Sequence, residues 1–450
     1  MSNSAQHYRG QGEPCFEPGP PLEGALTVPG SKSIAQRALL AACFGRRESR
    51  IVGARGPADV EAAVRMCSVL GAGVEVDPAG DAVTIRPGAG TPGGPLECGE
   101  SGTGARLALG LAALATPEGT EFELRPTGTL KQRSSGRLLS TLKRAGLEPH
   151  STGSGSLEFG FKSLGPQERR LQLREPSSSQ EVSALLMGLA AGGGGRLEVR
   201  GGIPSEPYVH LTRSTLKRLG IAIGFEHGRA SRTVFKVPDG GVKGGPFHVD
   251  PDASSGAVGL MALSLSHGSG HVVGFTRRSG QADAQVADCL AKMGASIQVD
   301  QGPIQVSGRP ENGARLDFSD CPDLAPVVAA AAGAVALRVP GDAGRTTLTG
   351  LQTLPGKESS RIEVLGHGLR ALGLQVHWDE RSLDVRQGST PPHAEPVVLD
   401  GCNDHRMVFA FALLSLVRPG IQVLGTSAVG KSWPSFFEAL EALGAVRPSN

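Results

Sequence analysis

The chain has 450 residues, a formal net charge of +2 and only 4% aromatic residues, whereas glycine occurs 65 times. A chain of this length exceeds one ordinary hydrophobic core, so we expect at least two domains with close-packed helices. The near-neutral charge argues against binding of nucleic acid or a membrane surface through a diffuse field. Any anion site must therefore come from a local cluster of cations.

Seven cysteines are scattered along the chain without a C-x-x-C pair. This pattern predicts reduced thiols in a cytoplasmic protein rather than a disulfide or zinc framework. No stretch has the length and apolarity of a membrane span. Residues 1–23 are polar and rich in proline and glycine, and they lack the apolar segment of a signal peptide, so we expect a disordered leader there.

The stretch 30–42 reads G-S-K-S-I-A-Q-R-A-L-L-A-A, and its small apolar residues predict a helix that is buried on most faces. Its start combines Ser31, Lys32 and Ser33 with unpaired backbone N–H groups, and Arg37 follows one turn later. Such a start favours a bound phosphate or carboxylate. An ordinary capped helix with solvated cations explains this stretch equally well when it is taken alone.

An internal repeat of about 75 residues runs through the chain. Six amphipathic segments each end at a glycine, which predicts a left-handed helix C-cap, and an alternating, strand-like stretch follows. These glycines are Gly71, Gly146, Gly220, Gly294, Gly373 and Gly444.

Each amphipathic segment is preceded by a helix that is small, apolar and polar only at its start. These starts lie at Ser31, Ser101, Ser179, Ser254, Asp323 and Asp404. Three such repeats per lobe predict two lobes of ordinary domain size. A solenoid is the alternative, but six buried helices favour helices enclosed by sheets.

The boundaries of the lobes follow from two breaks in the pattern. The proline- and glycine-rich stretch 237–247 indicates a crossover near the midpoint, and the second break falls before the helix start at 30. We therefore expect lobe one to comprise 24–29 and 250–450, lobe two to comprise 30–249, and the active site to lie in the cleft between them.

Polar residues concentrate at the starts of the predicted buried helices and in the adjoining loops. They are Lys32, Ser33, Arg37, Thr103, Arg106, Arg133, Ser178, Ser179, Gln180, Lys357, Arg361, Arg406 and Lys431. In a nearly neutral protein this predicts focused recognition of a substrate with several phosphate or carboxylate groups. Asp323 and Glu358 are candidate general base and general acid, although N-capping is the alternative for Asp323 and Asp404.

A second motif, G-T-S-A-V-G-K-S at 425–432, matches the phosphate-binding loop of nucleoside triphosphatases. Two features oppose a P-loop nucleotide-binding protein. Only 18 residues follow Ser432, and Pro434 interrupts the helix that must continue from the loop. Lys431 remains a candidate anion ligand.

From residue 24 to 440 the chain resembles the 5-enolpyruvylshikimate-3-phosphate synthase family. The matching motifs are P-G-S-K-S-I-x-x-R-A-L-L-A-A, G-T-x-x-R, S-S-Q-x-x-S-A-L-L-M, P-Y, D-A-S-S, P-D, K-E-x-x-R, N-D-H-R-M and K-S-W-P-S-F-F. The resemblance implies an α/β fold of two lobes, each with three βαβαββ units, that close over the substrates.

The resemblance also implies a reaction. The family transfers the enolpyruvyl group of phosphoenolpyruvate to the 5-hydroxyl of shikimate 3-phosphate and releases phosphate, through a tetrahedral intermediate, in the shikimate pathway of aromatic amino-acid biosynthesis. Asp323 would take the hydroxyl proton, and Glu358, with Lys431 near it, would protonate the methylene carbon; Lys32 completes the expected catalytic set. No metal or organic cofactor is implied, and we expect a monomer without nucleic-acid or membrane partners.

The implied ligands divide between the two substrates. Those of phosphoenolpyruvate are Lys32, Gly102, Arg133, Gln180, Arg361, Arg406 and Lys431. Those of shikimate 3-phosphate are Lys32, Ser33, Arg37, Ser178, Ser179, Gln180, Ser205, Tyr208, Asp323 and Lys357. Gly102 falls where the family packs a glycine against phosphoenolpyruvate, which is also the place of glyphosate.

The chain departs from the family's usual residues at a few positions, none of which removes a catalytic group. They are Glu100, Leu107, Ser134, Ser135, Glu206 and Thr353. The departures near Gly102 and Arg133 bear on phosphoenolpyruvate affinity and inhibitor sensitivity.

Two other readings are open. The related UDP-N-acetylglucosamine enolpyruvyl transferases carry a reactive cysteine in the loop that corresponds to 126–134, where this chain has none. A member that binds anions without turnover is the other alternative, and the intact charged residues Lys32, Asp323 and Glu358 oppose it.

Overall fold

The computed structural model describes residues 13–448, except 79, 89–92, 151–156, 166, 229–230 and 389–395. The chain divides into two compact units. Unit 1 comprises Met1–Val28, Ala253–Ser279 and Asp283–Asn450, and unit 2 comprises Pro29–Asp252 and Gly280–Ala282. Among the residues described, every helix is too short or too polar to cross a membrane.

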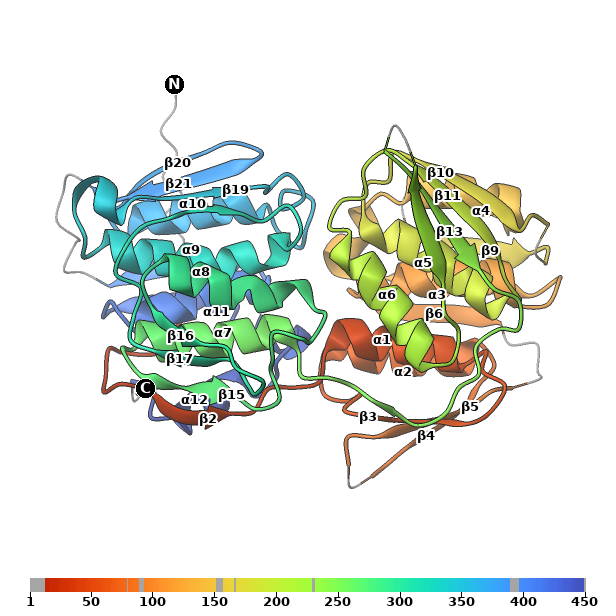
Figure 1. Ribbon diagram of the computed structural model, residues 1–450, viewed down its shortest axis with the longest axis horizontal. Coiled ribbons are helices and arrows are strands. Elements are labelled where there is room, and N and C mark those ends of the chain that lie inside the picture. Colours follow the sequence, from red (N-terminus) through yellow and green to blue (C-terminus); the bar gives the residue numbers. More distant parts are fainter. Residues whose placement is uncertain are drawn as a thin grey trace. The chain divides into compact units, whose positions relative to one another are not determined.

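Unit 2 is built from three repeats in which helices alternate with strands (Figure 1). The first contains α1 (Lys32–Ala42), β3 (Ser49–Val52), α2 (Ala58–Val69), β4 (Gly73–Val76) and β5 (Val83–Arg86), joined by β14 (Phe247–His248). The second contains β6 (Gly94–Gly99), α3 (Gly102–Ala115), β7 (Glu121–Pro126), the 3-10 helix η1 (Gly128–Gln132), α4 (Gly136–Ala145), β8 (Leu147–Pro149) and β9 (Phe159–Ser163). The third contains β10 (Arg170–Arg174), α5 (Ser179–Ala191), β11 (Gly195–Arg200), α6 (Pro207–Arg218), β12 (Gly224–Gly228) and β13 (Arg232–Val237).

Unit 1 repeats the same plan. Its first repeat contains β2 (Glu23–Leu26), α7 (Ala253–Leu265), β15 (Ser269–Val272), η2 (Ala282–Gln285), α8 (Val286–Lys292), β16 (Ser296–Gln298) and β17 (Gln305–Ser307). The second contains β18 (Arg315–Asp317), η3 (Pro322–Leu324), α9 (Ala325–Ala336), η4 (Gly341–Gly344), β19 (Thr346–Thr349), α10 (Arg361–Ala371), β20 (Gln375–Trp378) and β21 (Ser382–Arg386). The third contains β22 (Val397–Asp400), α11 (His405–Ser415), β23 (Ile421–Leu424), η5 (Thr426–Lys431) and α12 (Phe436–Glu441), joined by β1 (Glu13–Pro14).

The four-stranded sheets share one topology, seen in the orders β6-β7-β9-β8, β10-β11-β13-β12 and β18-β19-β21-β20, whereas the last repeat has the three-stranded order β1-β23-β22. In each of these four-stranded sheets, the first two strands are parallel and the other pairs are antiparallel. Two sheets take their first strand from a distant part of the chain, because β14 pairs with β3 and β2 pairs with β15. The predicted α/β fold with three βαβαββ units in each half is confirmed.

The six helices predicted to be buried are α1, α3, α5, α7, α9 and α11, and in α9 every residue from Ala325 to Ala336 is buried. Helices α1, α3 and α5 pack against one another inside unit 2, and α7, α9 and α11 do so inside unit 1 (Figure 1). Small residues permit this packing. A Cβ added at Gly110 of α3 would lie 2.3 Å from the carbonyl oxygen of Ala184 in α5, so only glycine fits there.

The six glycines predicted to end the amphipathic helices all have positive φ, between 85° and 120°, as left-handed C-caps require. Strands β4, β8, β12, β16 and β20 follow the first five. After Gly444 the expected strand is reduced to an isolated bridge between Val446 and Glu17.

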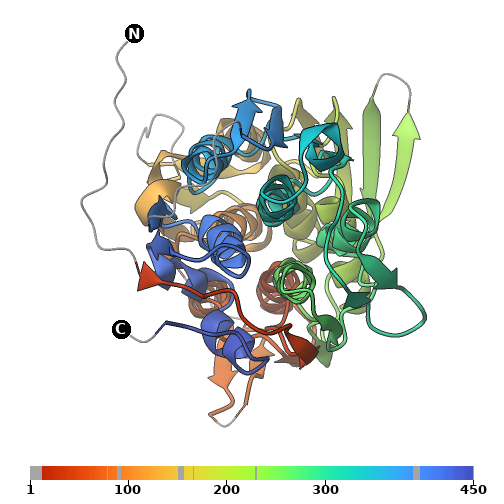
Figure 2. The ribbon, with the colours of Figure 1, turned by 90° about the vertical axis from the view of Figure 1, so that its left-hand side faces the viewer.

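The prediction of a disordered leader is wrong for residues 13–23, while residues 1–12 lie outside the described part. Strand β1 pairs antiparallel with β23, and the N-terminal segment runs beside the C-terminal elements of unit 1 (Figure 2). Cys15 and Phe16 are buried, and Phe16 N donates to Ser415 Oγ at 3.0 Å. The Phe16 ring packs against Phe436 and Phe437. Cys15, Phe16 and Leu22 anchor this segment, whereas residues 17–21 are exposed.

Candidate functional site

In unit 2 the starts of three helices are joined by side-chain hydrogen bonds. Lys32, the first residue of α1, places Nζ 3.1 Å from Oδ2 of Asp59 in α2. The buried Gln36 donates from Nε2 to Asp59 O at 3.1 Å and to Ser101 Oγ at 3.0 Å. Ser101 is the N-cap of α3 and accepts from Gly104 N. Side-chain hydrogen bonds therefore link the starts of α1, α2 and α3.

Arg106 joins α3 to α5 and to the segment after η1. Its Nη1 donates to Gln180 Oε1 at 2.8 Å, its Nε to Ser135 Oγ at 2.9 Å and its Nη2 to Ser134 O at 3.1 Å. Burial lowers the pKa of Arg106 to about 10, so the guanidinium stays charged at neutral pH. These hydrogen bonds hold the Arg106 guanidinium within unit 2, and its expected part in anion recognition stays a prediction. Ser134 and Ser135, which depart from the family's usual residues, thus accept hydrogen bonds from Arg106.

Side-chain hydrogen bonds from two residues hold the start of α5. Ser178, the N-cap, accepts from Gln180 N at 3.2 Å, and Glu181 accepts from Ser177 N at 2.9 Å and from Ser177 Oγ at 3.1 Å. Gln180 Nε2 also donates to Thr103 Oγ1 at 3.0 Å. Sequence reasoning missed Glu181, although the spacing S-x-x-E predicts such a cap. The hydroxyls and the amide expected to bind substrate thus lie at a rigid helix start.

Arg37 lies between α1 and α6. Its Nε donates to Thr212 Oγ1 and its Nη1 to Ser33 O, both at 2.7 Å, and Nη2 is 3.5 Å from Tyr208 O. Burial lowers its pKa to about 10. Ser205, just before α6, has a left-handed φ of 53°, which is strained for a residue other than glycine. Two predicted ligands of shikimate 3-phosphate, Ser33 and Tyr208, therefore contact this arginine through their backbone carbonyls.

Gly102 and Arg133 lie together at the start of α3. A Cβ added at Gly102 would lie 3.0 Å from Arg106 Nη1 and 3.5 Å from Arg133 Nη1. The missing side chain thus leaves backbone N–H groups at the helix start next to two guanidinium groups. Such a place suits a small anion.

In unit 1 a single buried guanidinium joins three carboxylates. Arg361, at the start of α10, is only 2% exposed and lies 2.7 Å from Asp404 Oδ2, 2.8 Å from Asp323 Oδ1 and 2.7 Å from Glu358 Oε2. Burial opposes its charge, but the carboxylates of Asp404, Glu358 and Asp323 raise its pKa above the ordinary value. The two predicted acid–base residues are therefore held by one side chain.

Asp323 is surrounded by cations. Lys357 Nζ lies 3.2 Å from its Oδ1, Arg406 Nη2 lies 3.5 Å from its Oδ2, and Arg406 Nη1 donates to its backbone carbonyl at 2.7 Å. Burial opposes ionisation, but Arg406, Lys357 and Arg361 hold the pKa of this carboxyl well below its usual range. Asp323 is consequently ionised, and it does not act as the side-chain cap of a helix: no side-chain capping bond is present at η3 or α9.

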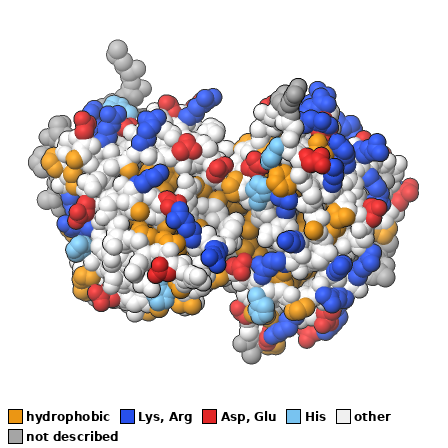
Figure 3. Space-filling view, in the orientation of Figure 1, with side chains coloured by type: hydrophobic (Ala, Val, Ile, Leu, Met, Phe, Trp, Pro, Cys, Tyr) orange, Lys and Arg blue, Asp and Glu red, His pale blue; other side chains and the backbone are white. Residues whose placement is uncertain are grey.

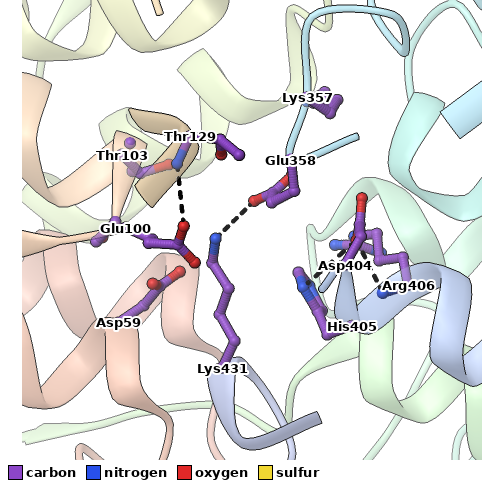
Figure 4. A network of polar contacts seen from close by, with 12 residues as sticks. Asp59, Glu100, Thr103, Thr129, Lys357, Glu358, Asp404, His405, Arg406 and Lys431 are labelled. Carbon is purple, nitrogen blue, oxygen red and sulfur yellow. Dashed lines mark hydrogen bonds and ion pairs between the residues drawn. The ribbon is translucent and has the colours of Figure 1, made fainter. Parts of the chain in front are cut away.

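Glu358 uses its second oxygen for Lys431. Lys431 Nζ donates to Glu358 Oε1 at 2.8 Å, and both side chains are largely buried (Figure 4). Lys431 is the last residue of η5, and α12 begins only at Phe436. A phosphate-binding loop requires a helix that opens directly from the loop, so the P-loop alternative is wrong.

Asp404 is the N-cap of α11, which was one of the alternatives predicted for it, and it accepts from Arg406 N at 3.0 Å (Figure 4). It is also fully buried and paired with Arg361. The two residues before it, Cys402 and Asn403, have left-handed φ values of 49° and 52°. The strained turn at 402–403 therefore directly precedes the carboxylate that pairs with Arg361. Asp283, which sequence reasoning missed, accepts from the Ser254 hydroxyl and lies 3.8 Å from Arg406 Nη1.

The structure thus gathers the predicted residues into two clusters. The cluster of unit 2 contains Lys32, Ser33, Arg37, Gly102, Arg133, Ser178, Ser179, Gln180, Ser205 and Tyr208. The cluster of unit 1 contains Asp323, Lys357, Glu358, Arg361, Arg406 and Lys431. No group of histidine, cysteine, aspartate and glutamate side chains among the described residues has the arrangement of a metal site. The fold is a sixfold α/β repeat, and its two clusters place cations, hydroxyls and carboxylates at or near the starts of helices.

Comparison with known proteins gives the family. The model of EPSP synthase (3-phosphoshikimate 1-carboxyvinyltransferase) matches residues 16–440. The 3-phosphoshikimate 1-carboxyvinyltransferase of Methanopyrus kandleri is 32% identical and covers 94% of this chain and 96% of its own, and that of Halobacterium salinarum is 33% identical with 94% and 97%. The chain belongs to the EPSP synthase family.

Solved structures share the fold. The EPSP synthase of Acinetobacter baumannii has a TM-score of 0.77 at 23% identity and covers 97% of this chain and 99% of its own. The enolpyruvyl transferase NikO of Streptomyces tendae has a TM-score of 0.70 at 19% identity, with 96% and 98% covered.

Proposed function

We propose that the two clusters together carry out the family's reaction. As a member of this family the protein is a transferase of the shikimate pathway of aromatic amino-acid biosynthesis. It transfers the enolpyruvyl group of phosphoenolpyruvate to the 5-hydroxyl of shikimate 3-phosphate and releases phosphate. The observation that carries the assignment of roles is the network in which Arg361 holds both Asp323 and Glu358.

In the proposed first step, Asp323 removes the proton of the 5-hydroxyl while the oxygen of that hydroxyl attacks C2 of phosphoenolpyruvate. The methylene carbon takes a proton from the Glu358–Lys431 pair, whose atoms lie 2.8 Å apart. In the elimination the Glu358–Lys431 pair takes back a proton from the new methyl group, Asp323 returns its proton to the leaving phosphate, and the double bond is restored. Asp323 and the Glu358–Lys431 pair each transfer one proton in each step and end in their starting states, as general acid–base catalysis requires.

The depressed pKa of Asp323 makes it a weak base before substrate binds. The cations that depress it, Arg406 and Lys357, are also proposed ligands of the substrates. An anionic substrate that takes up part of their charge raises the pKa of Asp323 towards the value that a base needs. Binding of both substrates therefore activates the base, which protects phosphoenolpyruvate when shikimate 3-phosphate is absent.

Anion binding divides as the resemblance implies. Phosphoenolpyruvate is held by Lys32, Gly102, Arg133, Gln180, Arg361, Arg406 and Lys431. Shikimate 3-phosphate is held by Lys32, Ser33, Arg37, Ser178, Ser179, Gln180, Ser205, Tyr208, Asp323 and Lys357. Guanidinium groups at buried helix starts support this division, since they bind phosphate and carboxylate bidentately. Because each substrate draws on both clusters, neither unit is expected to turn over alone.

The direct test incubates the protein with shikimate 3-phosphate and phosphoenolpyruvate and measures released phosphate. UDP-N-acetylglucosamine replaces shikimate 3-phosphate in a second arm. Asp323→Asn removes the base, and Asp320→Asn, an exposed neighbour, is the matched control. Release with UDP-N-acetylglucosamine but not with shikimate 3-phosphate would refute the assignment.

We also propose that the enzyme is a cytoplasmic monomer. All seven cysteines are free thiols. Val273 and Val446 are the large hydrophobic side chains exposed among the described residues, and elsewhere on the face in Figure 3 hydrophobic groups lie among polar and charged ones. An obligate interface needs a larger apolar area. Light scattering during size-exclusion chromatography tests the monomer.

A further inference from the structure

One carboxylate lies within the anion-binding cluster of unit 2. Glu100 directly precedes Ser101, the N-cap of α3, and so stands at the helix start where Gly102 and Arg133 meet. An anionic side chain here competes with an anionic substrate for the same positive potential. The contacts of Glu100 indicate what it contributes in return.

Glu100 holds the first turn of η1. Its Oε1 accepts from Thr129 N at 3.2 Å (Figure 4). A Cβ added at Gly128 would lie only 1.8 Å from the same oxygen, and Gly128 has a φ of 53°. The Glu100 carboxylate can therefore lie against the backbone of η1 only because residue 128 is glycine.

Thr129 carries the contact on to Arg133. The Thr129 hydroxyl accepts from Arg133 Nη2 at 3.3 Å. The backbone of η1 adds a second link, because Arg133 N donates to Leu130 O at 3.2 Å. A displacement of Thr129 is thus transmitted to the guanidinium of Arg133.

We propose that Glu100 is a positioning residue that sets the affinity for phosphoenolpyruvate through two opposed effects. Its carboxylate oxygen fixes Thr129 and thereby Arg133, which strengthens binding. Its negative charge offsets part of the attraction between Arg133 and the substrate, which weakens binding. This inference rests on the proposed role of Arg133 as a ligand of phosphoenolpyruvate.

Two substitutions separate the effects. Glu100→Gln keeps an oxygen acceptor for Thr129 N and removes the charge. We expect the KM for phosphoenolpyruvate to fall by about 3- to 10-fold, the scale of one unit charge near a protein surface, with kcat and the KM for shikimate 3-phosphate little changed. The gain shrinks in added salt because it is Coulombic. Glu100→Ala removes the acceptor as well, and we expect its KM to be about 2- to 10-fold above that of Glu100→Gln, the scale of one lost neutral hydrogen bond.

Glu97→Gln is the matched control, because it makes the same charge change on β6, where Glu97 pairs with the exposed Arg125 at 3.2 Å. Thr129→Ala removes the hydroxyl partner of Arg133 but keeps the Glu100 charge, so it is expected to raise the KM for phosphoenolpyruvate above the wild-type value. A merely structural role would move thermal stability and kcat, not the KM for one substrate.

The outcomes are distinct. An unchanged KM in Glu100→Gln overturns the charge effect, and equal KM values in Glu100→Gln and Glu100→Ala overturn the positioning effect. Arg133→Gln separates this inference from its premise. If Arg133→Gln raises the KM for phosphoenolpyruvate while the Glu100 variants match the wild type, only the inference fails. If Arg133→Gln leaves that KM unchanged, the proposed role of Arg133 fails and the inference fails with it.

Discussion

Replacement of Arg361 by methionine tests whether the buried network holds unit 1 together. The substitution keeps side-chain volume but removes the cation that Asp404, Asp323 and Glu358 share. Asp404 is fully buried, so its charge has no access to water when Arg361 is gone. A buried carboxylate without its partner is strongly destabilising because its desolvation is no longer offset.

The expected loss is about 3–5 kcal/mol, the cost of removing one partner of a buried ion pair. Asp404→Asn costs less, about 1–2 kcal/mol, because asparagine remains a good N-cap and Arg361 keeps two carboxylates. The double variant Arg361→Met/Asp404→Asn leaves no unpaired charge at position 404. Its loss should therefore be smaller than the sum of the two single losses by at least about 1 kcal/mol.

Tryptophan fluorescence during urea unfolding provides the assay. The chain has two tryptophans, and both Trp378 and Trp433 belong to unit 1, so the signal reports that unit alone. Arg345→Met is the control, because it breaks the Arg345–Asp384 pair, in which Arg345 is 48% exposed. An exposed pair of this kind contributes at most about 1 kcal/mol.

The loss should also depend on pH. The folded-state pKa of Asp323 lies well below its usual range, so its share of the stability is present above the unfolded-state pKa of about 4 and is lost as pH falls through the folded-state pKa. Without Arg361 the pKa of Asp323 rises, and the wild-type advantage shrinks as pH falls from 7 towards 3. A loss below about 1 kcal/mol, or one that does not change with pH, would refute the reasoning.

Three further predictions concern catalysis, the N-terminal segment and the core of unit 2. Asp323→Asn and Lys32→Met should each lower kcat/KM by at least about 100-fold while the protein stays folded at the assay temperature, the scale of general-base and electrostatic terms; near-normal rates would remove the residue from its role. Phe16→Ala should destabilise unit 1 by about 3–5 kcal/mol in the tryptophan assay, because the buried ring leaves a cavity beside Phe436, and an unchanged midpoint would contradict the burial of this segment. Gly110→Ala should separate α3 from α5 and lower the thermal stability of the protein by about 1–3 kcal/mol or more, while Gly430→Ala, where a Cβ meets no atom within 4 Å, should not; equal effects would contradict the close helix contact.

Much of the fold follows from local patterns. Hydrophobic periodicity predicts one buried and one amphipathic helix in each repeat. Each C-cap glycine marks a helix end because only glycine takes up positive φ without strain. The same patterns located most of the charged residues of both clusters, since a helix start is visible in sequence as a polar group before an apolar run. Lys32, Asp323 and Arg406 were found in this way.

Other features depend on partners that are distant in sequence. No local pattern predicts the pairing of β2 with β15 or of β14 with β3. The same is true of the packing of Phe16 against Phe436. Composition likewise does not distinguish a cation that binds substrate from one that binds the protein. Arg106 and Arg133 look alike in sequence and both lie next to Gly102, yet Arg106 is buried on serine and glutamine acceptors whereas Arg133 is partly exposed and donates to Thr129.

The sequence by itself determined the sixfold repeat, the helix starts and the family to which they point, because these depend on spacing along one chain. Only the tertiary structure decided how the charges are shared. One guanidinium, that of Arg361, stabilises three carboxylates at once, and the pKa of Asp323 is set by cations on three different segments. Electrostatic energy depends on distance and burial in space, and neither is encoded in the order of residues.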